Sequence, residues 1–400
     1  MGNAEGYENY YHRFSKKEYA RRHAKVREAM KAKNLDCLIV FGTSGVGNAV
    51  NVRYLSNYAD YLHSYIIFPL DKEPTQFMGL YCHLYNAKAI SEIEDITWGG
   101  NDIAKNVAEK IRQLGLDKKR IGIVGIAKRF SSVPHDHYLV LKERLPQAEF
   151  ENATSLLEEI RAIPSPEEVE ALKEGGQLTD KIMQVMVDAV RPGITEYQLS
   201  AEVKFAGEKE GGHVHVFLLG STPMSNPRMP YPWPFPSRRM IQPGDLILTE
   251  LSVETMEGYS GQVIRPIALG EPDEEYWRLY NAALRVCQGI PPLLKTGNKP
   301  RQFLEVTRTI SEAGFTIEAP VIHGRAGTTV PPLIGLPGLE LYNSALDEPL
   351  KENQSIQIEP NPCTKDLRKG IFLGDMYRVT SKGGESYQHF PMEFIIKKAK

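Results

Sequence analysis

The order of apolar and polar positions in the first 160 residues predicts helices that alternate with short buried strands. Residues 15–31 carry apolar side chains at helical spacing among Lys, Arg and Glu, which is typical of an amphipathic helix. Short apolar runs of the kind that buried strands make occur at 35–41, 65–69 and 120–124. Further helical stretches occur at 101–114 and 135–144. This alternation predicts a mixed α/β domain.

A domain boundary is predicted at residues 163–168. Proline interrupts the preceding pattern there, and Ser165-Pro166 followed by two glutamates is a helix-start signal. A long amphipathic helix is expected from this point to about residue 190. The remaining sequence alternates strands and helices, with strands expected at 214–219, 246–251, 354–359 and 376–380, and helices at 274–287 and 301–313. The expected domains are residues 1–160 and 161–400.

Residues 226–236 have prolines at alternating positions. Proline fixes φ and has no N–H, so this composition favours a stiff, extended loop. Such a loop would present Tyr231, Trp233 and Phe235. We favour a lid or wall of a pocket, and the alternative is a contact with another subunit.

Composition limits the class of protein. The 400 residues are 42% hydrophobic and 24% charged, enough apolar material for two globular cores. The 48 basic and 50 acidic side chains give a net charge of -2, which indicates no electrostatic footprint for nucleic acid or an anionic membrane surface. No apolar run approaches the roughly 20 residues of a membrane span, and residues 1–13 lack an apolar leader, so we expect a cytoplasmic location. Four cysteines without CxxC spacing indicate reduced thiols: Cys37, Cys82, Cys287 and Cys363.

Five polar motifs accompany the predicted strands of the second half. They are Gly244–Glu250, Gly258–Arg265, Ile322–Gly327, Ile356–Pro360 and Gly374–Tyr377. Their order and spacing, the two-domain length and the Ser-Pro-Glu-Glu linker resemble the creatinase/methionine aminopeptidase superfamily, and within it creatinase and the Xaa-Pro peptidases. The resemblance covers nearly the whole chain. It implies an amino-terminal creatinase-like α/β domain, a carboxy-terminal pita-bread domain with a curved antiparallel sheet, and a homodimer whose partner completes the pocket.

The resemblance also bears on metal binding. Metallopeptidases of this superfamily hold two divalent cations with two aspartates, a histidine and two glutamates, because several carboxylates must offset the repulsion between the cations. The matching positions here carry Glu250, Gln262, His323, Glu359 and Gly374, with Asp375 beside the last. A neutral amide cannot bridge two cations, so we expect no dinuclear site and no cofactor. A single divalent metal held by His323, the remaining glutamates and Asp375 stays open.

Creatinase is the superfamily's precedent for working without metal, and it hydrolyses a guanidino C–N bond with a histidine and carboxylates. Of its functional positions only Glu359 matches cleanly. The others carry Ser225, Ile264, Gly335 and His63. Creatine is therefore not the expected substrate. The 12-residue interval between Glu250 and Gln262 also resembles the branch that cleaves dimethylsulfoniopropionate.

We expect His323, Glu359 and Glu250 to be catalytic, with His323 as general acid or base and the carboxylates polarising a cationic or amide group. Arg325 suits a carboxylate or phosphate group, and its alternative is a salt bridge to one of these glutamates. His213 and His215 stand two apart in a predicted strand, so we expect both on one face. The residues predicted to bind substrate are Gln262, Arg325, His213, His215, Trp233, Tyr259, Asp375 and His63.

These residues predict an enzyme that hydrolyses a C–N bond of a small polar metabolite without a dinuclear metal site. Three alternatives stay open: a lyase that abstracts a proton and eliminates a leaving group, an Xaa-Pro-type metallopeptidase with an altered metal site, and a non-catalytic binding module. The expected partners are a small-molecule substrate and a second copy of the chain.

Overall fold

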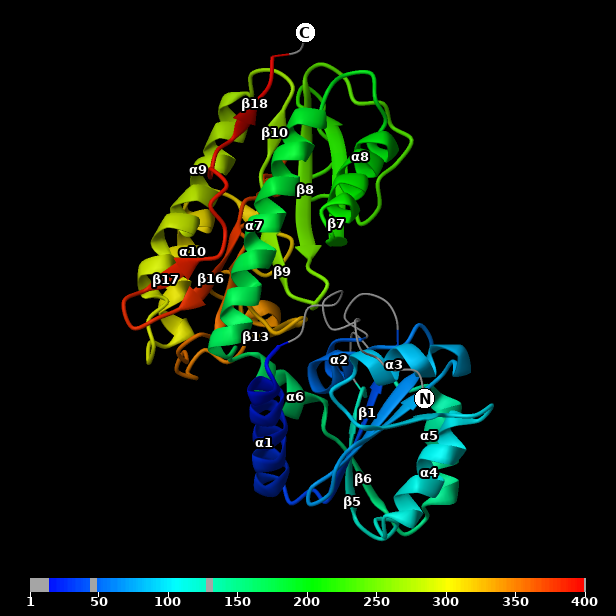
Figure 1. Ribbon diagram of the computed structural model, residues 1–400. Coiled ribbons are helices and arrows are strands. Elements are labelled where there is room, and N and C mark those ends of the chain that lie inside the picture. Colours follow the sequence, from blue (N-terminus) through cyan, green and yellow to red (C-terminus); the bar gives the residue numbers. More distant parts are fainter. Residues whose placement is uncertain (1–13, 44–48, 127–131, 399–400) are drawn as a thin grey trace. The chain divides into compact units, whose positions relative to one another are not determined.

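The computed structural model describes residues 14–43, 49–126 and 132–398 (Figure 1). The chain divides into two compact units, Met1–Arg161 and Ala162–Lys400. Within the described ranges, no helix combines the length and the apolar character needed to cross a membrane.

The first unit is built on a six-stranded mixed sheet in the order β4-β3-β2-β1-β5-β6. Its strands are β1 (Cys37–Gly42), β2 (Ser64–Pro69), β3 (Thr75–Met78), β4 (Asp95–Trp98), β5 (Arg120–Val124) and β6 (Glu149–Asn152). Its helices are α1 (Lys16–Ala32), α2 (Val50–Ser56), α3 (Leu84–Ile90), α4 (Ile103–Gln113), α5 (His135–Arg144) and α6 (Thr154–Arg161). The three strands and three helices expected from the sequence in this part are all present.

Alternation of side chains along the central strands gives this sheet two apolar faces. Leu38 and Val40 of β1 pack with residues of α1, α2 and α6, whereas Cys37 and Ile39 pack with residues of α4 and α5. Burial on both faces explains why β1 is a continuous apolar run rather than an alternating one.

The second unit begins with α7 (Pro166–Ala189), whose start agrees with the sequence prediction. The Ser165 hydroxyl accepts from the Glu168 backbone N–H at 3.2 Å, and Glu168 Oε2 accepts from the Ser165 N–H at 2.9 Å. This capping box, with Pro166 in the first turn, satisfies two backbone donors that the helix itself cannot. Helix α8 (Glu196–Lys209) begins with the same arrangement of Thr195 and Gln198.

Two largely antiparallel sheets form the body of this unit. The first has the order β18-β10-β8-β7, with β9 also paired to β8, and packs against α7 and α8. Its strands are β7 (His213–Pro223), β8 (Asp245–Glu254), β9 (Ser260–Val263), β10 (Ile267–Ala268) and β18 (Ile395–Ile396).

The second sheet has the order β13-β12-β14-β16-β17 and packs against α9 (Glu274–Gly289) and α10 (Phe303–Glu312). Its strands are β12 (Ile322–Arg325), β13 (Thr329–Ile334), β14 (Ser355–Ile358), β16 (Asp375–Val379) and β17 (Gly384–Ser386). A small pair, β11 (Thr316–Ile317) and β15 (Pro362–Cys363), lies outside both sheets. An isolated bridge between Ile264 and Gly374 joins the two main sheets.

Helix α7 approaches the backbone of the β8–β9 hairpin closely. A Cβ atom on Gly175 would lie 2.7 Å from the Tyr259 carbonyl oxygen, and one on Gly176 would overlap the carbonyl oxygen of Tyr387. Two adjacent glycines in the middle of a helix are therefore required by packing, against their low helix propensity.

We predict that Gly176→Ala lowers the free energy of unfolding by about 2 kcal/mol, because the added methyl group meets rigid backbone. In an exposed helix position, Gly→Ala would raise the free energy of unfolding by about 1 kcal/mol. The sign of the change therefore distinguishes a closely packed glycine from an exposed one. Urea denaturation of wild type and variant measures the difference, with Gln177→Ala on the exposed side of α7 as the control. A Gly176→Ala protein as stable as wild type would contradict the close approach.

Candidate active site

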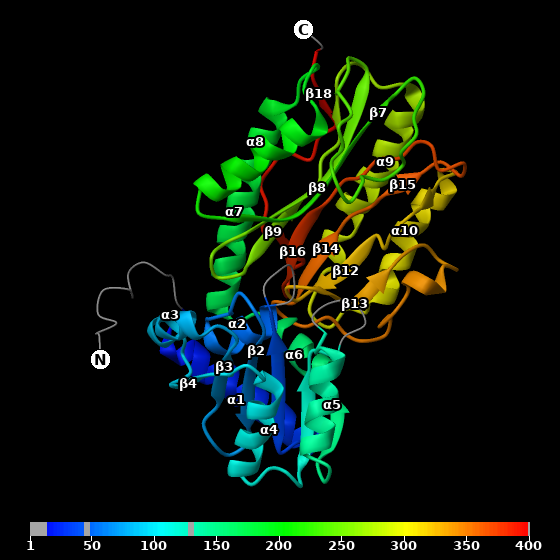
Figure 2. The same cartoon turned by 90° about the vertical axis from the view of Figure 1, so that its right-hand side faces the viewer.

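Strand pairing gathers the predicted catalytic residues from both sheets of the second unit. Glu250 lies on β8 and Gln262 on β9, while His323 lies on β12 and Glu359 directly follows β14. Strands β12 and β14 are paired, with His323 opposite Gln357. Figure 2 shows β9 beside β16, with β14 and β12 following across the second sheet.

His323 and Glu359 form a buried pair. Nε2 of His323 lies 3.3 Å from Oε1 of Glu359, and the two side chains are 7% and 8% exposed. Nδ1 of His323 lies 2.9 Å from the Gly324 carbonyl oxygen, which can only accept, so Nδ1 carries the hydrogen. When the ring is neutral, the Nε2 lone pair points at this carboxylate oxygen, and when the ring is protonated, Nε2–H donates to it. The pair is therefore suited to hold a proton between Nε2 and Oε1, or to take one from a water molecule.

Glu250 is the second acid of the pocket and is half-buried. Loss of hydration, and then the charge of Glu359, raise its pKa to about 8, and Arg325 opposes this shift. At neutral pH the Glu250 carboxyl group is therefore largely protonated. A protonated carboxyl group beside an acid–base pair is suited to donate its proton.

Gln262 links Arg325 to Glu359. Its Oε1 accepts from Nη1 of Arg325 and, at 3.3 Å, from the Ser252 hydroxyl. Its Nε2 donates to Oε2 of Glu359 at 2.8 Å. Arg325 also donates from Nη2 to the Ser260 hydroxyl at 2.8 Å. The expected pocket residues Gln262 and Arg325 thus lie at the pair, but they bind protein groups there.

Two positions that the resemblance matches to metal ligands, Gln262 and Gly374, offer no free ligand atom from a carboxylate. The one ligand atom of Gln262, Oε1, already accepts from Arg325 and Ser252. At Gly374, a Cβ would overlap the Ile358 carbonyl oxygen and lie 2.9 Å from the Glu359 Cα, so the backbone leaves no room for a side chain. Two of the five positions that the resemblance matches to metal ligands therefore supply no free carboxylate.

Tyr231 is a pocket residue that sequence analysis did not include among the predicted site residues. Its ring packs on Phe372 with centroids 4.7 Å apart. Burial first, and then the charges of Glu250 and Glu359, raise the pKa of its phenol. The hydroxyl is therefore protonated and near both acids. The alternating prolines indicated the loop, but not which of its aromatic rings faces inward.

Trp233 of the same loop lies at the surface, unlike Tyr231. It is 57% exposed, and its indole lies over Gly220 of β7, where an added Cβ would come within 2.5 Å of Cδ1. Its carbonyl oxygen accepts from the Leu219 N–H at 2.9 Å, which holds the loop along β7. The expected contact of Trp233 with substrate stays a prediction.

Two further residues predicted to bind substrate, Tyr259 and Asp375, interact with other side chains of the protein. The Tyr259 hydroxyl donates to Oε1 of Glu168 at 2.7 Å, at the start of α7. Asp375 pairs with the fully buried Arg265 at 2.9 Å. Burial raises the pKa of Asp375 to about 7 against the effect of this arginine. Both residues stabilise the hairpin region in this arrangement, and a contact with substrate stays a prediction.

The expectation that His213 and His215 share one face of a strand is wrong. A β-bulge interrupts the pairing of β7 with β8 between Val214 and Val216, so the regular alternation fails at His215. His213 is 65% exposed and lies 2.8 Å from Glu208, whereas His215 is 9% exposed and lies 2.9 Å from Glu254.

His63 belongs to the first unit. Its ring lies edge-on to His137, with centroids 5.1 Å apart, and both line a cavity of about 370 Å³. The Tyr65 hydroxyl lies 2.8 Å from Nδ1 of His137, and burial lowers the pKa of this histidine. The role expected for His63 in a partner's pocket stays a prediction.

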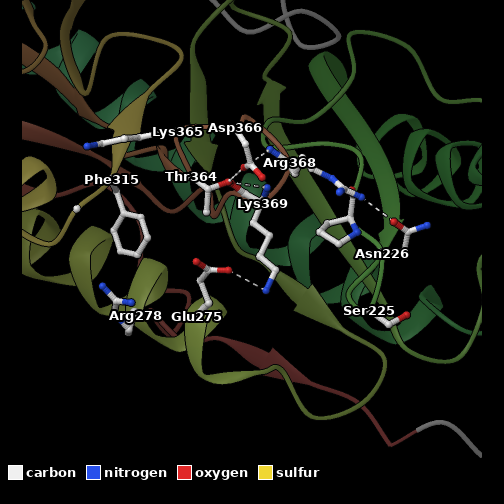
Figure 3. Close-up of a pocket in the computed structure, with 12 residues that line it drawn as sticks. Ser225, Asn226, Glu275, Arg278, Phe315, Thr364, Lys365, Asp366, Arg368 and Lys369 are labelled. Carbon is white, nitrogen blue, oxygen red and sulfur yellow. Dashed lines mark hydrogen bonds and ion pairs between the residues drawn. The ribbon is translucent and has the colours of Figure 1, made fainter.

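A second cavity, of about 550 Å³, lies in the second unit and is shown in Figure 3. Arg368 donates to Oδ1 of Asn226 at 2.7 Å, and Lys369 lies 3.0 Å from Glu275. None of the lining residues belongs to the His323–Glu359 pair or its partners. This cavity is therefore not the one that the predicted catalytic residues define.

Comparison with known proteins identifies the family. Residues 170–381 match the model of metallopeptidase family M24, and residues 22–163 match that of the creatinase/prolidase N-terminal domain. The chain therefore belongs to metallopeptidase family M24. Its characterised relatives described below are hydrolases.

Individual relatives are distant but cover nearly the whole chain. The chain is 24% identical over 367 residues to an Xaa-Pro dipeptidase of Lactobacillus helveticus, covering 88% of this chain and 94% of the relative. It is 22% identical over 404 residues to an ectoine hydrolase of Halomonas elongata, covering 96% and 98%. The crystal structure of the prolidase from Pyrococcus horikoshii OT3 has a TM-score of 0.77 at 20% identity, covering 94% and 100%. The predicted two-domain fold is confirmed.

The raised pKa of Glu250 predicts a specific pH dependence of stability. Its ordinary value is 4.5 and its value in the folded protein is about 8, so between these pH values the folded state binds a proton that the unfolded state has lost. The stability of wild type relative to Glu250→Gln should therefore fall as pH rises from 5 to 9. Denaturant unfolding of both proteins across this range measures it. Parallel stability profiles would contradict the shift.

Proposed function

We propose that this protein hydrolyses a C–N bond of a small polar metabolite with its own acid–base side chains, without a dinuclear metal site. The observation that carries the proposal is the buried pair of His323 Nε2 and Glu359 Oε1, 3.3 Å apart, beside the protonated carboxyl group of Glu250. An acid and a base held in one pocket at different protonation states are what hydrolysis of an amide-type bond needs.

In the proposed reaction, His323 and Glu359 act together as the base. When no proton lies between Nε2 and Oε1, both atoms accept, and a water molecule can donate to them. As the water oxygen attacks the substrate carbon, its proton passes to the pair. The proton held by Glu250 passes to the leaving nitrogen. The C–N bond is replaced by C–O and N–H, and the proton on the pair restores Glu250 after product release.

Substrate binding follows from the remaining groups. The phenol of Tyr231 is protonated near both glutamates, so it can donate to an anionic oxygen that develops during attack. Its ring and that of Phe372 supply an apolar wall. This combination supports a compact substrate with one polar reacting group. The similarity to an ectoine hydrolase over 98% of that relative makes ectoine the first compound to test.

A second candidate is cleavage of Xaa-Pro dipeptides. The similarity to an Xaa-Pro dipeptidase over 94% of its length and to the solved prolidase over its full length supports it. Against it, Gln262 and Gly374 replace two metal-binding carboxylates, and the amide of Gln262 is already bonded. We also propose a homodimer, which sedimentation velocity would reveal as twice the mass of the chain.

The function is tested with chelator-treated protein in ¹⁸O-labelled water. Ectoine, a panel of small polar amides and a panel of Xaa-Pro dipeptides are supplied, with and without added Mn²⁺. We expect turnover of a compound from the first two groups, unchanged by the chelator, and one ¹⁸O atom in the acid product. Turnover of Xaa-Pro dipeptides only with Mn²⁺ would establish the second candidate, and products without ¹⁸O would indicate a lyase.

We predict that His323→Ala and Glu359→Gln each lower kcat by about 10²–10⁴-fold, because either change removes one acceptor of the base pair. Glu250→Gln should lower kcat to a similar extent, and wild-type kcat should fall as pH rises above about 8, where Glu250 loses its proton.

Steady-state kinetics on the identified substrate measure these effects, with His83→Ala as the control. His83 is a histidine of the first unit that also pairs with an acid, Asp60, at 3.1 Å, and it is not a predicted site residue. Glu359→Gln with wild-type kcat would show that the pair is not the base.

A further inference from the structure

Arg325 supplies a guanidinium group to the pocket, and two side-chain hydrogen bonds hold this group in place. It stands two residues after His323 on β12, and its guanidinium donates to Gln262 Oε1 and to the Ser260 hydroxyl. Loss of hydration lowers its pKa, while the acids near it, Glu250, Glu254 and Glu359, raise it. These carboxyl groups come from β8 and from the end of β14, so Arg325 faces acids of both sheets.

Gln262 transmits the orientation of Arg325 to Glu359. An arginine can only donate, so the amide atom facing it must be the carbonyl oxygen. The amide nitrogen is therefore the group that donates to Glu359 Oε2, at 2.8 Å. The hydrogen-bonded chain runs from the guanidinium through the amide to the carboxylate whose other oxygen faces His323. Glutamate at position 262 would break this chain, because it would have no N–H to donate.

We propose that Arg325 is the built-in counter-cation of this pocket, and that with Gln262 it takes the place of the divalent cations that related peptidases bind. The guanidinium offsets the charge of the pocket carboxylates, and the amide of Gln262 holds Glu359 toward His323. Arg325 is thus a positioning residue. Its fork-shaped group is needed, since a lysine ammonium cannot span the amide and the Ser260 hydroxyl in the same geometry.

Two features of the chain support this assignment. The cation occupies the Oε1 atom of Gln262 that a metal would need, so metal binding and the arginine contact exclude each other there. Gly374 has no side chain to supply the last carboxylate of the matched ligand set, and the close backbone of Ile358 leaves no room for one. A pocket that has lost two anionic ligands and holds one guanidinium is balanced without a dication.

The proposal predicts that a divalent cation binds only after Arg325 is removed. Isothermal titration calorimetry with MnCl₂ on chelator-treated protein at pH 7.5 compares wild type, Arg325→Met, Arg325→Met/Gln262→Glu and the control Arg378→Met. Arg378 is a partly buried arginine that pairs with Glu385 away from the pocket. We expect no saturable binding by wild type or Arg378→Met. Arg325→Met should bind one Mn²⁺ with a Kd at least about tenfold below the highest MnCl₂ concentration at which wild type shows no saturation. The double variant should have a lower Kd still.

Saturable binding of Mn²⁺ by wild type that His323→Ala abolishes would overturn the proposal. So would folded Arg325 variants, verified by circular dichroism, that bind Mn²⁺ no better than wild type. Because the proposal builds on the metal-independent function suggested above, the readouts are kept separate. Absence of turnover would count against that function alone, whereas Mn²⁺ binding by wild type would count against the role proposed here for Arg325.

Stability provides a second measurement if Arg325→Met is too unstable for calorimetry. The proposal expects Arg325→Met to lower the melting temperature, and Glu359→Gln added to it to restore most of the loss, because the uncompensated carboxylate is removed. Combining Glu359→Gln with Arg378→Met should give additive effects. Additive effects in both pairs would show that Arg325 is only a structural contact and would overturn the proposal.

Discussion

The pocket of this protein depends on how a buried and a half-buried glutamate, Glu359 and Glu250, are kept together. Glu250 and Glu359 lie close enough for the charge of one to raise the pKa of the other, and burial leaves little water to screen them. Three features of the structure reduce the repulsion between these two carboxyl groups. Glu250 retains its proton, Glu359 accepts from Gln262 and faces His323, and Arg325 lies near both.

The two sheets of the second unit make this arrangement possible. Glu250 and Gln262 come from the hairpin of the first sheet, and His323 and Glu359 from paired strands of the second. The Ile264–Gly374 bridge brings the sheets to backbone contact, which requires a residue without a side chain at position 374. The same close approach recurs where Gly175 and Gly176 of α7 meet the hairpin region. The pairing of the strands thus brings the predicted catalytic side chains together.

The two-domain scaffold is kept in this family at low sequence identity. A TM-score of 0.77 at 20% identity shows that the two-domain architecture tolerates replacement of most side chains. By the resemblance, His323 and Glu359 match the histidine and one glutamate of the peptidase pocket, while an aspartate and a glutamate position carry Gln262 and Gly374. A fold is therefore a weak guide to the reaction, and the hydrogen-bonded partners of the retained residues are a better one.

Sequence alone determined the elements and the main site positions. Ser165-Pro166 marked the start of α7 and apolar runs marked the central strands, because these patterns are set by the local backbone. The order of the motifs led to His323 and Glu359 through their resemblance to the superfamily. Only the tertiary structure decided the partners. The Gln262–Glu359 bond joins residues 97 apart, the bulge at His215 separates it from His213, and packing selects Tyr231 rather than Trp233 as the inward ring. Such choices depend on which strands meet in space, and no local periodicity contains that information.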